Sequence, residues 1–463
     1  MKLQPLWFFG VVITASVLSR ASVFAETTGH SKIATWRVGV ARCVVTPETS
    51  VWLAGYGFKR IPDGKLHDLW VKALALEDAE GRRAVLITSD FQGIPKGMSD
   101  EVFERLKSEL KLERYQVMFT YSHNHCAPRL GDDLVDCYPF DPEQVELVRQ
   151  YTALVVTKVV EVVKKALGEV APADLHATMG KATFAVNRRN NREVDVPQLA
   201  QDEKLAGPVD HTVPVMTVTR PEGELVAILF GYACHPTTLN FLKWCGDYPG
   251  FAQIELEQNH SGVTAMFVNT CGGDQNPLPR RSVELCQRYG HMLAAGVEEA
   301  LKQPCHAISP KLRTAFEYVE LPYLKVVNRP ELESWREDDD PAHARWAARM
   351  LKKLDAGEAF ASAYPYPIHA WQLGQETLVI GLGGESVVDY ALRFKRQFGP
   401  TTWVCGYTDD LVAYIPSRRV WEEGGFEGGS HLYAYGRPAL RWSGDVEDRI
   451  VNTVHKLVEQ IRD

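Results

Sequence analysis

The sequence predicts a mixed α/β fold, in which a mixed β-sheet core is covered on the outside by helices within a single large domain. Three pairs of apolar, β-branched segments are joined by short turns, which is typical of β-hairpins. These pairs alternate along the chain with segments whose apolar residues recur at helical spacing. Hairpins that alternate with helices indicate a sheet core under helices. No repeat or linker divides the chain, so we expect residues 26–463 to form one domain.

The strands are predicted from alternating or continuous apolar runs that stop at turn residues. The first run, from Trp36 to Thr46, alternates and stops at Pro47. The hairpin at 69–90 turns at Asp78-Ala-Glu-Gly-Arg, and that at 213–233 turns at Pro221-Glu-Gly-Glu. The predicted strands and hairpins are 36–46, 69–90, 115–122, 213–233, 263–269, 311–321, 367–382 and 402–408.

The helices are predicted from amphipathic spacing and from residues that favour helix starts. Ser99 begins a segment that resembles a capping box, and Pro142 lies in the first turn of a long amphipathic helix. The segment 328–358 is charged and helical, and we expect it to be a solvated excursion outside the core. The other predicted helices are 99–111, 141–167, 250–258, 281–302, 386–397 and 445–461.

The N-terminus has the features of a signal peptide. Lys2 precedes an apolar run from Leu3 to Leu18, and Val23-Phe24-Ala25 provides small residues for cleavage. The run is short for a membrane span, and no later segment is long and apolar enough. We therefore expect a signal peptide at 1–25, export to the periplasm or the medium, and no stable membrane span after cleavage. An uncleaved N-terminal anchor is the alternative.

Composition limits the partners and the redox chemistry. The formal net charge is −8 and basic residues are not clustered, so nucleic acid is not expected as a partner. Protein partners are left undetermined. The nine cysteines cannot all pair within one chain, and their apolar surroundings suggest mostly buried thiols with one or two disulfides.

A pair of histidines follows the predicted strand 115–122. His123 and His125 are two residues apart, and side chains at that spacing share a face of an extended segment. Both imidazoles are thus expected to reach one small site. Neutral imidazole is a common zinc ligand. Two surface or hydrogen-bonded histidines are the alternative, and this stretch alone leaves both open.

Other predicted strands also end in residues that suit a site. Strand 225–233 ends in Cys234-His235-Pro236, and hairpin 367–382 leads to Gly383-Gly384-Glu385. Strand 402–408 leads toward Tyr414. The polar loop 269–277 can present backbone N–H groups to an anion or a carbonyl, although a simple helix entry is the commoner outcome for such a loop.

Taken together and in order, these motifs resemble those of the neutral/alkaline (non-lysosomal) ceramidases over most of the chain after the signal peptide. His123-Asn-His125-Cys-Ala-Pro128 is similar to the family's His-Thr-His-Ser-Gly-Pro, and Asn187-Arg188 to its Asn-Arg pair. Cys234-His235-Pro236 is similar to its Val-His-Pro-Thr, and Gly383-Gly384-Glu385 to its Pro-Gly-Glu. Tyr414 and the downstream Glu427-Gly-Gly resemble its Tyr-Val-Thr-Thr and Tyr-Glu-Gly elements.

The resemblance implies an enzyme that uses Zn²⁺ and a set of residues that hold it. The implied metal ligands are His123, His235, Glu385 and Tyr414, with Tyr414 the ligand most easily displaced, or acting instead on the oxyanion. His125 and Arg188 are implied to face the substrate, with His125 as proton carrier. We add Asp274 as a substrate-binding residue, and Asn276 as a catalytic residue that holds substrate oxygen with Arg188.

Two features depart from the family pattern. Asn276 stands where the family's Gly-Asp-x-Ser-Pro-Asn carries a serine, and an amide cannot act as nucleophile. A serine acyl-enzyme is therefore excluded, and attack on the substrate by a metal-activated water remains. The protein is also expected to lack the family's C-terminal β-rich domain. Because the loops 129–141, 189–210 and 322–366 are polar, we expect a smaller or more polar N-acyl compound to be preferred over ceramide.

The resulting hypothesis is an exported zinc-dependent hydrolase that cleaves an amide (N-acyl) bond of a small-molecule or lipid-like substrate. An ester or lactone hydrolase with the same metal site is one alternative, and a catalytically inactive binding relative is another. A cysteine nucleophile is a further alternative, because Cys126, Cys234 and Cys271 lie beside the motifs. Small thiols that pack behind a site would give the same pattern.

Overall fold

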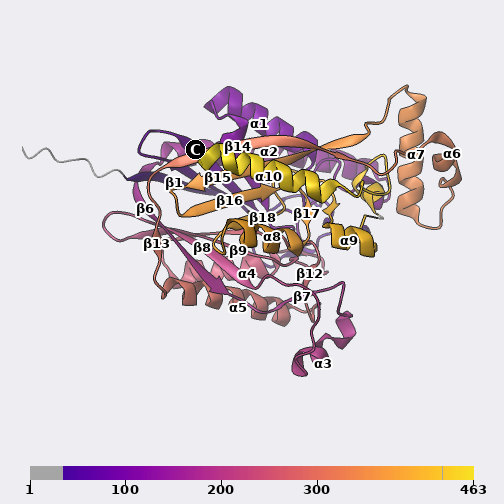
Figure 1. The fold of residues 1–463 in the computed structure, drawn as a ribbon. Coiled ribbons are helices and arrows are strands. Elements are labelled where there is room, and N and C mark those ends of the chain that lie inside the picture. The colour runs from indigo at the N-terminus through magenta and orange to yellow at the C-terminus, as the bar shows by residue number, and fades with distance from the viewer. Residues whose placement is uncertain (1–34, 430, 463) are drawn as a thin grey trace, which may run out of the picture. The chain divides into compact units, whose positions relative to one another are not determined.

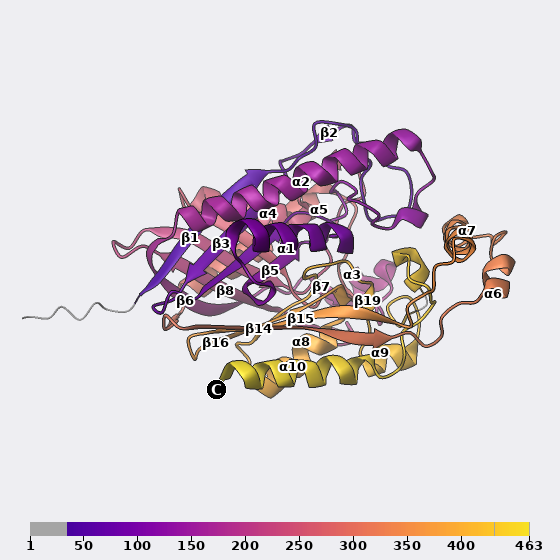
Figure 2. The ribbon, with the colours of Figure 1, turned by 90° about the horizontal axis from the view of Figure 1, so that it is seen from above.

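Two β-sheets packed face to face form the centre of the fold, in a computed structural model that describes residues 35–429 and 431–462. Helices cover the outer face of each sheet, so that the described chain has four layers, seen edge-on in Figure 2. The mixed α/β class with helices outside is therefore confirmed, with two sheets in the core. The predicted signal peptide, 1–25, lies outside the described residues.

The larger sheet has nine strands and mixed pairing. Its order is β11-β9-β8-β6-β1-β3-β4-β5, with β13 paired to β6. The pairs β4–β5 and β9–β11 are parallel, and the remaining pairs are antiparallel. The strands are β1 (Trp36–Val44), β3 (Trp70–Glu77), β4 (Arg83–Ser89), β5 (Val117–Tyr121), β6 (Ala171–Lys181), β8 (Thr212–Thr219), β9 (Leu225–Tyr232), β11 (Thr264–Asn269) and β13 (His306–Ala307).

The smaller sheet has four strands in the order β14-β15-β16-β18. They are β14 (Leu312–Pro322), β15 (Ala363–Leu373), β16 (Thr377–Leu382) and β18 (Trp403–Cys405). Large apolar side chains fill the space between the two sheets. Met118 and Leu229 come from the larger sheet, and Trp371 and Trp403 from the smaller one. The period-2 alternation of each strand places one row of side chains in this shared core.

The outer helices pack on the remaining face of each sheet. Gly39 of β1 shows how close the approach is, because a Cβ there would lie 1.9 Å from the carbonyl oxygen of Ala166 in α2. The larger sheet is covered by α1 (Lys96–Leu110), α2 (Pro142–Gly168), α4 (Asp247–Asn259) and α5 (Val283–Leu301), and the smaller one by α8 (Val388–Phe398) and α10 (Val446–Arg462), as Figure 1 shows.

Two helix starts were predicted, with different outcomes. Asp141 caps α2 by accepting hydrogen bonds from the N–H groups of Glu143 and Gln144, and Pro142 follows it, as predicted. The predicted start at Ser99 is wrong. The helix begins at Lys96 after Pro95, whose fixed φ favours a helix start, and the Ser99 N–H already donates to the Pro95 carbonyl.

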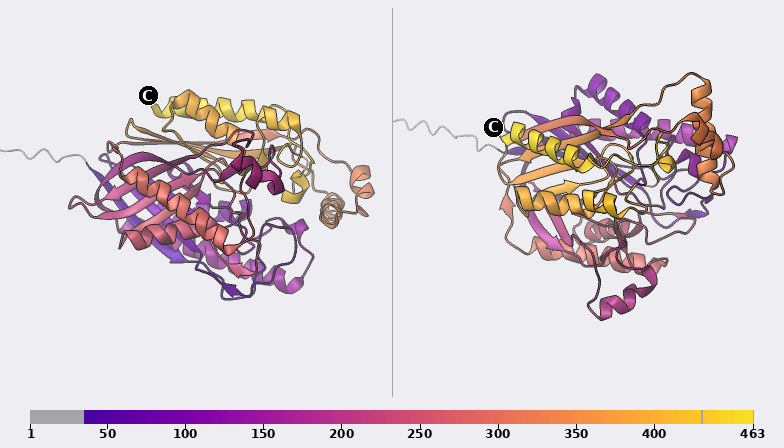
Figure 3. Two further views of the ribbon diagram at one scale, coloured as in Figure 1. Left: turned by 90° about the horizontal axis from the view of Figure 1, so that it is seen from below. Right: turned by 45° about the vertical axis from the view of Figure 1, so that its right-hand side comes forward.

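The segment 328–358 contains α6 (Arg329–Ser334) and α7 (Pro341–Asp355), which lie at one edge of the fold (Figure 3). The expectation that it is purely solvated is wrong. Leu332, Trp346 and Met350 form a small buried cluster of their own. Trp346 is fully buried, because the amphipathic face of α7 packs on α6 and on the segment around Tyr433.

The cysteines are all free thiols, so the expectation of one or two disulfides is wrong for this structure. Six of the nine are buried, and only Cys305 is exposed. None of the helices in the described ranges combines the length and apolar character needed to cross a membrane.

Candidate metal centre and active site

The ends of β5, β9 and β16 meet at one end of the two sheets. Isolated bridges between Thr120 and Thr408 and between Thr270 and Cys405 join the segments there. Short strands complete the site: β7 (Ala185–Asn187) pairs with β12 (Gln275–Pro277), and β17 (Glu385–Ser386) pairs with β19 (Tyr414–Ile415). In the second pair, Glu385 lies directly opposite Tyr414. Residues far apart in the sequence are thereby brought together.

Three side chains form a candidate metal site: His123, His235 and Glu385. Oε2 of Glu385 lies 3.1 Å from Nε2 of His123 and 2.9 Å from Nε2 of His235. Each of the three side chains is only 1% exposed. Buried carboxylate and imidazole groups that converge in this way require a counter-charge, which a bound cation supplies.

Backbone carbonyls fix the orientation of both imidazoles. Nδ1 of His123 lies 2.6 Å from the carbonyl oxygen of Gln92, and Nδ1 of His235 lies 2.7 Å from that of Gly272. A carbonyl oxygen only accepts, so each Nδ1 carries the proton and each Nε2 presents a lone pair to the centre. Burial lowers the pKa of His235 to about 4, which keeps this imidazole neutral. Two neutral imidazoles and a carboxylate fit zinc.

The backbone at the first histidine pair differs from the predicted extended segment. Strand β5 ends at Tyr121, and His123 has a left-handed φ of 66°. Few non-glycine residues adopt this conformation, and those that do are concentrated at functional sites. His123 and His125 nevertheless meet, with their Nε2 atoms 3.2 Å apart. The prediction that both reach one site is supported by this geometry, but a turn after the strand brings them together.

His125 lies beside the metal ligands in an enclosed position. Its ring packs edge-on against Tyr56 with centroids 4.6 Å apart. Gly55 leaves room for the ring, since a Cβ there would lie 2.4 Å from the imidazole. Burial holds the pKa of His125 well below its ordinary value. Its Nδ1 is buried and has no hydrogen-bond partner among the described residues. The ring is therefore neutral and suited to pass a proton.

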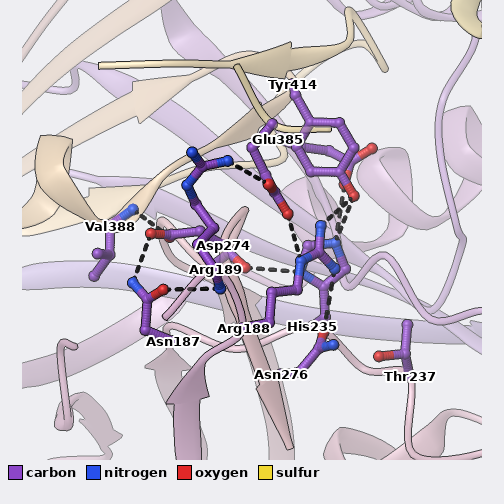
Figure 4. Close-up of polar contacts among 12 residues, drawn as sticks. Asn187, Arg188, Arg189, His235, Thr237, Asp274, Asn276, Glu385, Val388 and Tyr414 are labelled. Carbon is purple, nitrogen blue, oxygen red and sulfur yellow. Dashed lines mark hydrogen bonds and ion pairs between the residues drawn. The ribbon is translucent and has the colours of Figure 1, made fainter. Parts of the chain in front are cut away.

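Arg188 connects the other predicted catalytic groups (Figure 4). Its guanidinium donates to the Tyr414 hydroxyl at 2.9 Å, to Oδ1 of Asn276 at 3.2 Å and to Glu427 at 2.6 Å. The β7–β12 register, with Val186 opposite Asn276, places these groups side by side. The Tyr414 hydroxyl also lies 3.2 Å from Nε2 of His235. Tyr414, Arg188 and Asn276 therefore lie together in one site.

Asp274 has a different environment from the one expected of a substrate-binding residue. Its Oδ1 accepts from the N–H of Val388 at 2.9 Å, and its Oδ2 accepts from the side-chain amide of Asn187 at 3.0 Å. Its own carbonyl accepts from the N–H of Arg188 at 2.9 Å. Asp274 is fully buried, and Figure 4 shows it directed toward Val388 and Asn187. These contacts position the backbone that carries Arg188.

Two side chains at the site were given no role from the sequence. Tyr435 donates to Oε1 of Glu385 at 2.5 Å, and Glu427 accepts from both Arg188 and Arg189. Glu427 was visible as part of a family motif, although without a function. Tyr435 ends a single short turn of helix that shows neither periodicity nor a motif, so no pattern in the sequence indicated it.

The cysteines near the motifs do not suit nucleophilic catalysis. Burial raises the pKa values of Cys126, Cys234 and Cys271 above their ordinary range. The sulfur atoms lie near backbone carbonyls, those of Leu239, His235 and Val404, rather than near a base. A reactive cysteine needs a lowered pKa. These three thiols therefore have the properties of packing residues.

The chain is similar to known ceramidases in sequence and in fold. The neutral ceramidase of Pseudomonas aeruginosa is 22% identical over 91% of this chain and 72% of its own length. The crystal structure of a neutral ceramidase from Pseudomonas aeruginosa matches with a TM-score of 0.71 at 19% identity, covering 93% of this chain and 75% of that one. A ceramidase complexed with C2 matches with a TM-score of 0.69 at 18% identity, covering 92% and 76%.

The structural matches show a shared fold. The family model described as neutral/alkaline non-lysosomal ceramidase, N-terminal, matches residues 36–327, which is more than half of the chain. This range contains both histidines of the candidate metal site and also Arg188. The chain therefore belongs to the neutral/alkaline non-lysosomal ceramidase family.

Proposed function

We propose that the protein is an exported zinc-dependent hydrolase that cleaves the amide bond of an N-acyl substrate. The observation that carries the proposal is the convergence of His123, His235 and Glu385, with both Nε2 lone pairs directed at one carboxylate oxygen. Family membership supports hydrolysis of an amide, because the similar proteins are named ceramidases.

The proposed metal ligands are His123, His235, Glu385 and Tyr414. A bound zinc ion would supply Lewis acidity and lower the pKa of a bound water to about 7. The carbonyls of Gln92 and Gly272 keep the imidazoles in the required tautomer, as described above. Tyr414 differs from the other three ligands, because burial raises its pKa well above the ordinary value and leaves it a neutral phenol.

Arg188, Tyr414 and Asn276 would bind the substrate oxygen. Arg188 donates to the Tyr414 oxygen, so the phenol's own proton is free to point elsewhere. A guanidinium and a phenol fixed before the reaction stabilise a developing oxyanion without reorganisation. Asn276 accepts from Arg188 and holds the guanidinium in place.

His125 would carry the proton that the leaving amine needs. It is enclosed and neutral, and its Nε2 lies 3.2 Å from Nε2 of His123. A neutral imidazole can take a proton from the attacking water and give it to the leaving nitrogen. Asp274 would act indirectly, by holding the backbone of Arg188.

Metal analysis together with matched histidine variants tests the proposal. We expect about one equivalent of zinc per chain, loss of N-acyl amide hydrolysis on chelation, and recovery on adding zinc. His123→Ala should lose both metal and turnover. His291→Ala is the control, because His291 is exposed and pairs with Glu255. A zinc-free wild type with activity unaffected by chelator would contradict the proposal.

A substrate panel separates amide from ester hydrolysis. Both reactions pass through a tetrahedral oxyanion, so the same groups would serve an ester or lactone. We expect higher kcat/KM for N-acyl amides than for matched esters. A preference for esters by orders of magnitude would assign the alternative. If the zinc-loaded protein hydrolyses neither the amides nor the esters, it is a catalytically inactive binding relative.

Export is the remaining part of the proposal. The apolar run and cleavage residues at 1–25 support it. N-terminal sequencing of the protein from the periplasm or the medium should begin at Glu26. A protein retained in the cytoplasm with its first residues intact would contradict export.

A further inference from the structure

A cavity of about 600 Å³ lies away from the candidate metal site, between the segment 129–145 and the helices α6 and α7. None of the residues proposed above as metal ligand or catalytic group lines it. Its lining combines arginines with apolar side chains, among them Arg129, Tyr138, Phe140, Val145, Arg345 and Arg349. The function proposed above leaves this cavity without a role.

Arg129 lines the cavity and is largely buried. It is 7% exposed, and its guanidinium lies over the ring of Tyr138 at 4.0 Å from the centroid. Its Nε is buried without a hydrogen-bond partner, and its side chain makes no ion pair with any residue of the described ranges. A buried charge is normally paired, since an unpaired one carries a large desolvation cost. The guanidinium is therefore suited to an anion from outside the chain.

The cavity lining carries six cationic side chains and four carboxylates, so positive charge is in excess there. The charge of Arg349 is neutralised within the protein, because Arg349 forms an ion pair with Asp136. Arg345 donates to the carbonyl oxygens of Asp136 and Cys137 at 2.8 and 3.1 Å, and no carboxylate of the described chain pairs with it. Arg129 and Arg345 thus line one cavity without an ion pair to a described residue, although the charge of Asp133 acts on Arg129. A planar guanidinium group can donate two parallel hydrogen bonds to a carboxylate.

Apolar side chains provide the second part of the recognition. Phe140 is 80% exposed and Val145 is 55% exposed, and both line the cavity. An exposed phenylalanine beside a buried guanidinium suits a ligand with one anionic end and one apolar part. A small inorganic anion would leave this apolar surface unused.

We propose that this cavity is a second ligand site, which binds an amphipathic organic carboxylate through Arg129 and Arg345 and its apolar chain through Phe140 and Val145. Neither the metal site nor the proposed hydrolysis is needed for this binding. The two proposals can therefore fail separately.

Binding of octanoate to the full-length zinc-loaded protein, followed by calorimetry, tests this site. We expect octanoate to bind at least about tenfold more tightly than inorganic sulfate, and octanol not to bind. Arg129→Met should weaken octanoate binding about tenfold or more. Phe140→Asp should do the same without a risk to folding, because Phe140 is a surface residue. Val194→Asp is the control, since Val194 is 74% exposed and lies outside the cavity lining.

Three results would overturn the proposal. Octanoate that fails to bind wild type at millimolar concentration would exclude the site. Equal binding by wild type and Phe140→Asp would place the carboxylate elsewhere, for instance at the metal. Sulfate that binds as tightly as octanoate would show a simple anion site with no apolar part.

Discussion

Tyr435 donates a hydrogen bond of 2.5 Å to Oε1 of Glu385, while Oε2 of the same carboxylate faces both histidines. The phenol thus fixes the rotation of the carboxylate about its terminal bond. A metal ligand held by an outer hydrogen bond loses less freedom when the metal binds. Tyr435 is therefore expected to act through Glu385 and not on the substrate.

Tyr435→Phe should lower zinc affinity by about tenfold to a hundredfold. The ring remains, so packing is kept and only the hydrogen bond is lost. Competition with a chelator of known affinity measures the change. Tyr433→Phe is a matched control on the same short helix, η4 (Leu432–Tyr435), because its hydroxyl donates to Asp340 instead. Equal zinc affinity of Tyr435→Phe and wild type would show that the contact is incidental.

Arg188→Lys should reduce kcat by about a hundredfold, with a smaller effect on KM. Lysine keeps the charge but cannot reach Tyr414, Asn276 and Glu427 at the same time as the guanidinium does. Steady-state kinetics on an N-acyl amide measures the loss.

Arg189→Lys provides the control for this variant. Arg189 binds the same Glu427 but also Glu423, and within the described ranges its guanidinium forms no hydrogen bond with Tyr414. We expect its kcat to stay close to the wild-type value. A similar loss of kcat in both variants would mean that the effect comes from disturbing the 188–189 segment and not from losing the Arg188 guanidinium.

The hairpins and most helices were predictable because their patterns are local. The strands β8 and β9, for example, are rich in apolar residues and flank a short turn, and they pair as predicted. The site residues His123, His235 and Glu385 were predictable because each follows a recognisable strand and a motif. Their convergence on one point was implied by the family resemblance, not by spacing.

Other features depend on contacts that no local pattern contains. Strand β6 lies within the larger sheet, but its sequence, Ala171 to Lys181, has few apolar residues and did not indicate a strand. Its pairing with β1 and β8 stabilises it, which is tertiary context. The division of the strands between two sheets was also missed, because periodicity does not say which strands pair. The left-handed backbone at His123 is likewise imposed by its surroundings.

The preference for a polar N-acyl substrate over ceramide stays a prediction. The charged pairs that Arg188 and Arg189 make with Glu427 lie beside the site and favour polar substrate groups. We expect higher kcat/KM for water-soluble N-acyl amino compounds than for short-chain ceramide. Phe58, which is exposed and stacks on Tyr56, is an apolar surface that would favour ceramide instead. Faster ceramide cleavage, abolished by Phe58→Ser, would show that this apolar surface is used and that the prediction is wrong.

Asp410 should make stability depend on pH. It is 3% exposed, its Oδ2 accepts from the Tyr364 hydroxyl at 2.7 Å, and its Oδ1 has no partner among the described residues. Burial raises the pKa of Asp410 from 3.8 to about 6. Below 3.8 the carboxyl is protonated in both the folded and the unfolded chain. As pH rises toward 6 only the unfolded chain releases the proton, so this contribution to stability is lost.

Asp410→Asn should remove that loss, because the amide keeps an acceptor for Tyr364 and does not ionise. Between pH 4 and 7 the free energy of unfolding of wild type, relative to the variant, should fall by roughly 3 kcal/mol. Urea unfolding at a series of pH values measures this difference. Asp100→Asn is the control, because Asp100 is only partly buried and is paired with Lys96 on α1. Parallel pH curves for wild type and Asp410→Asn would mean that Asp410 ionises near its ordinary pKa despite its burial.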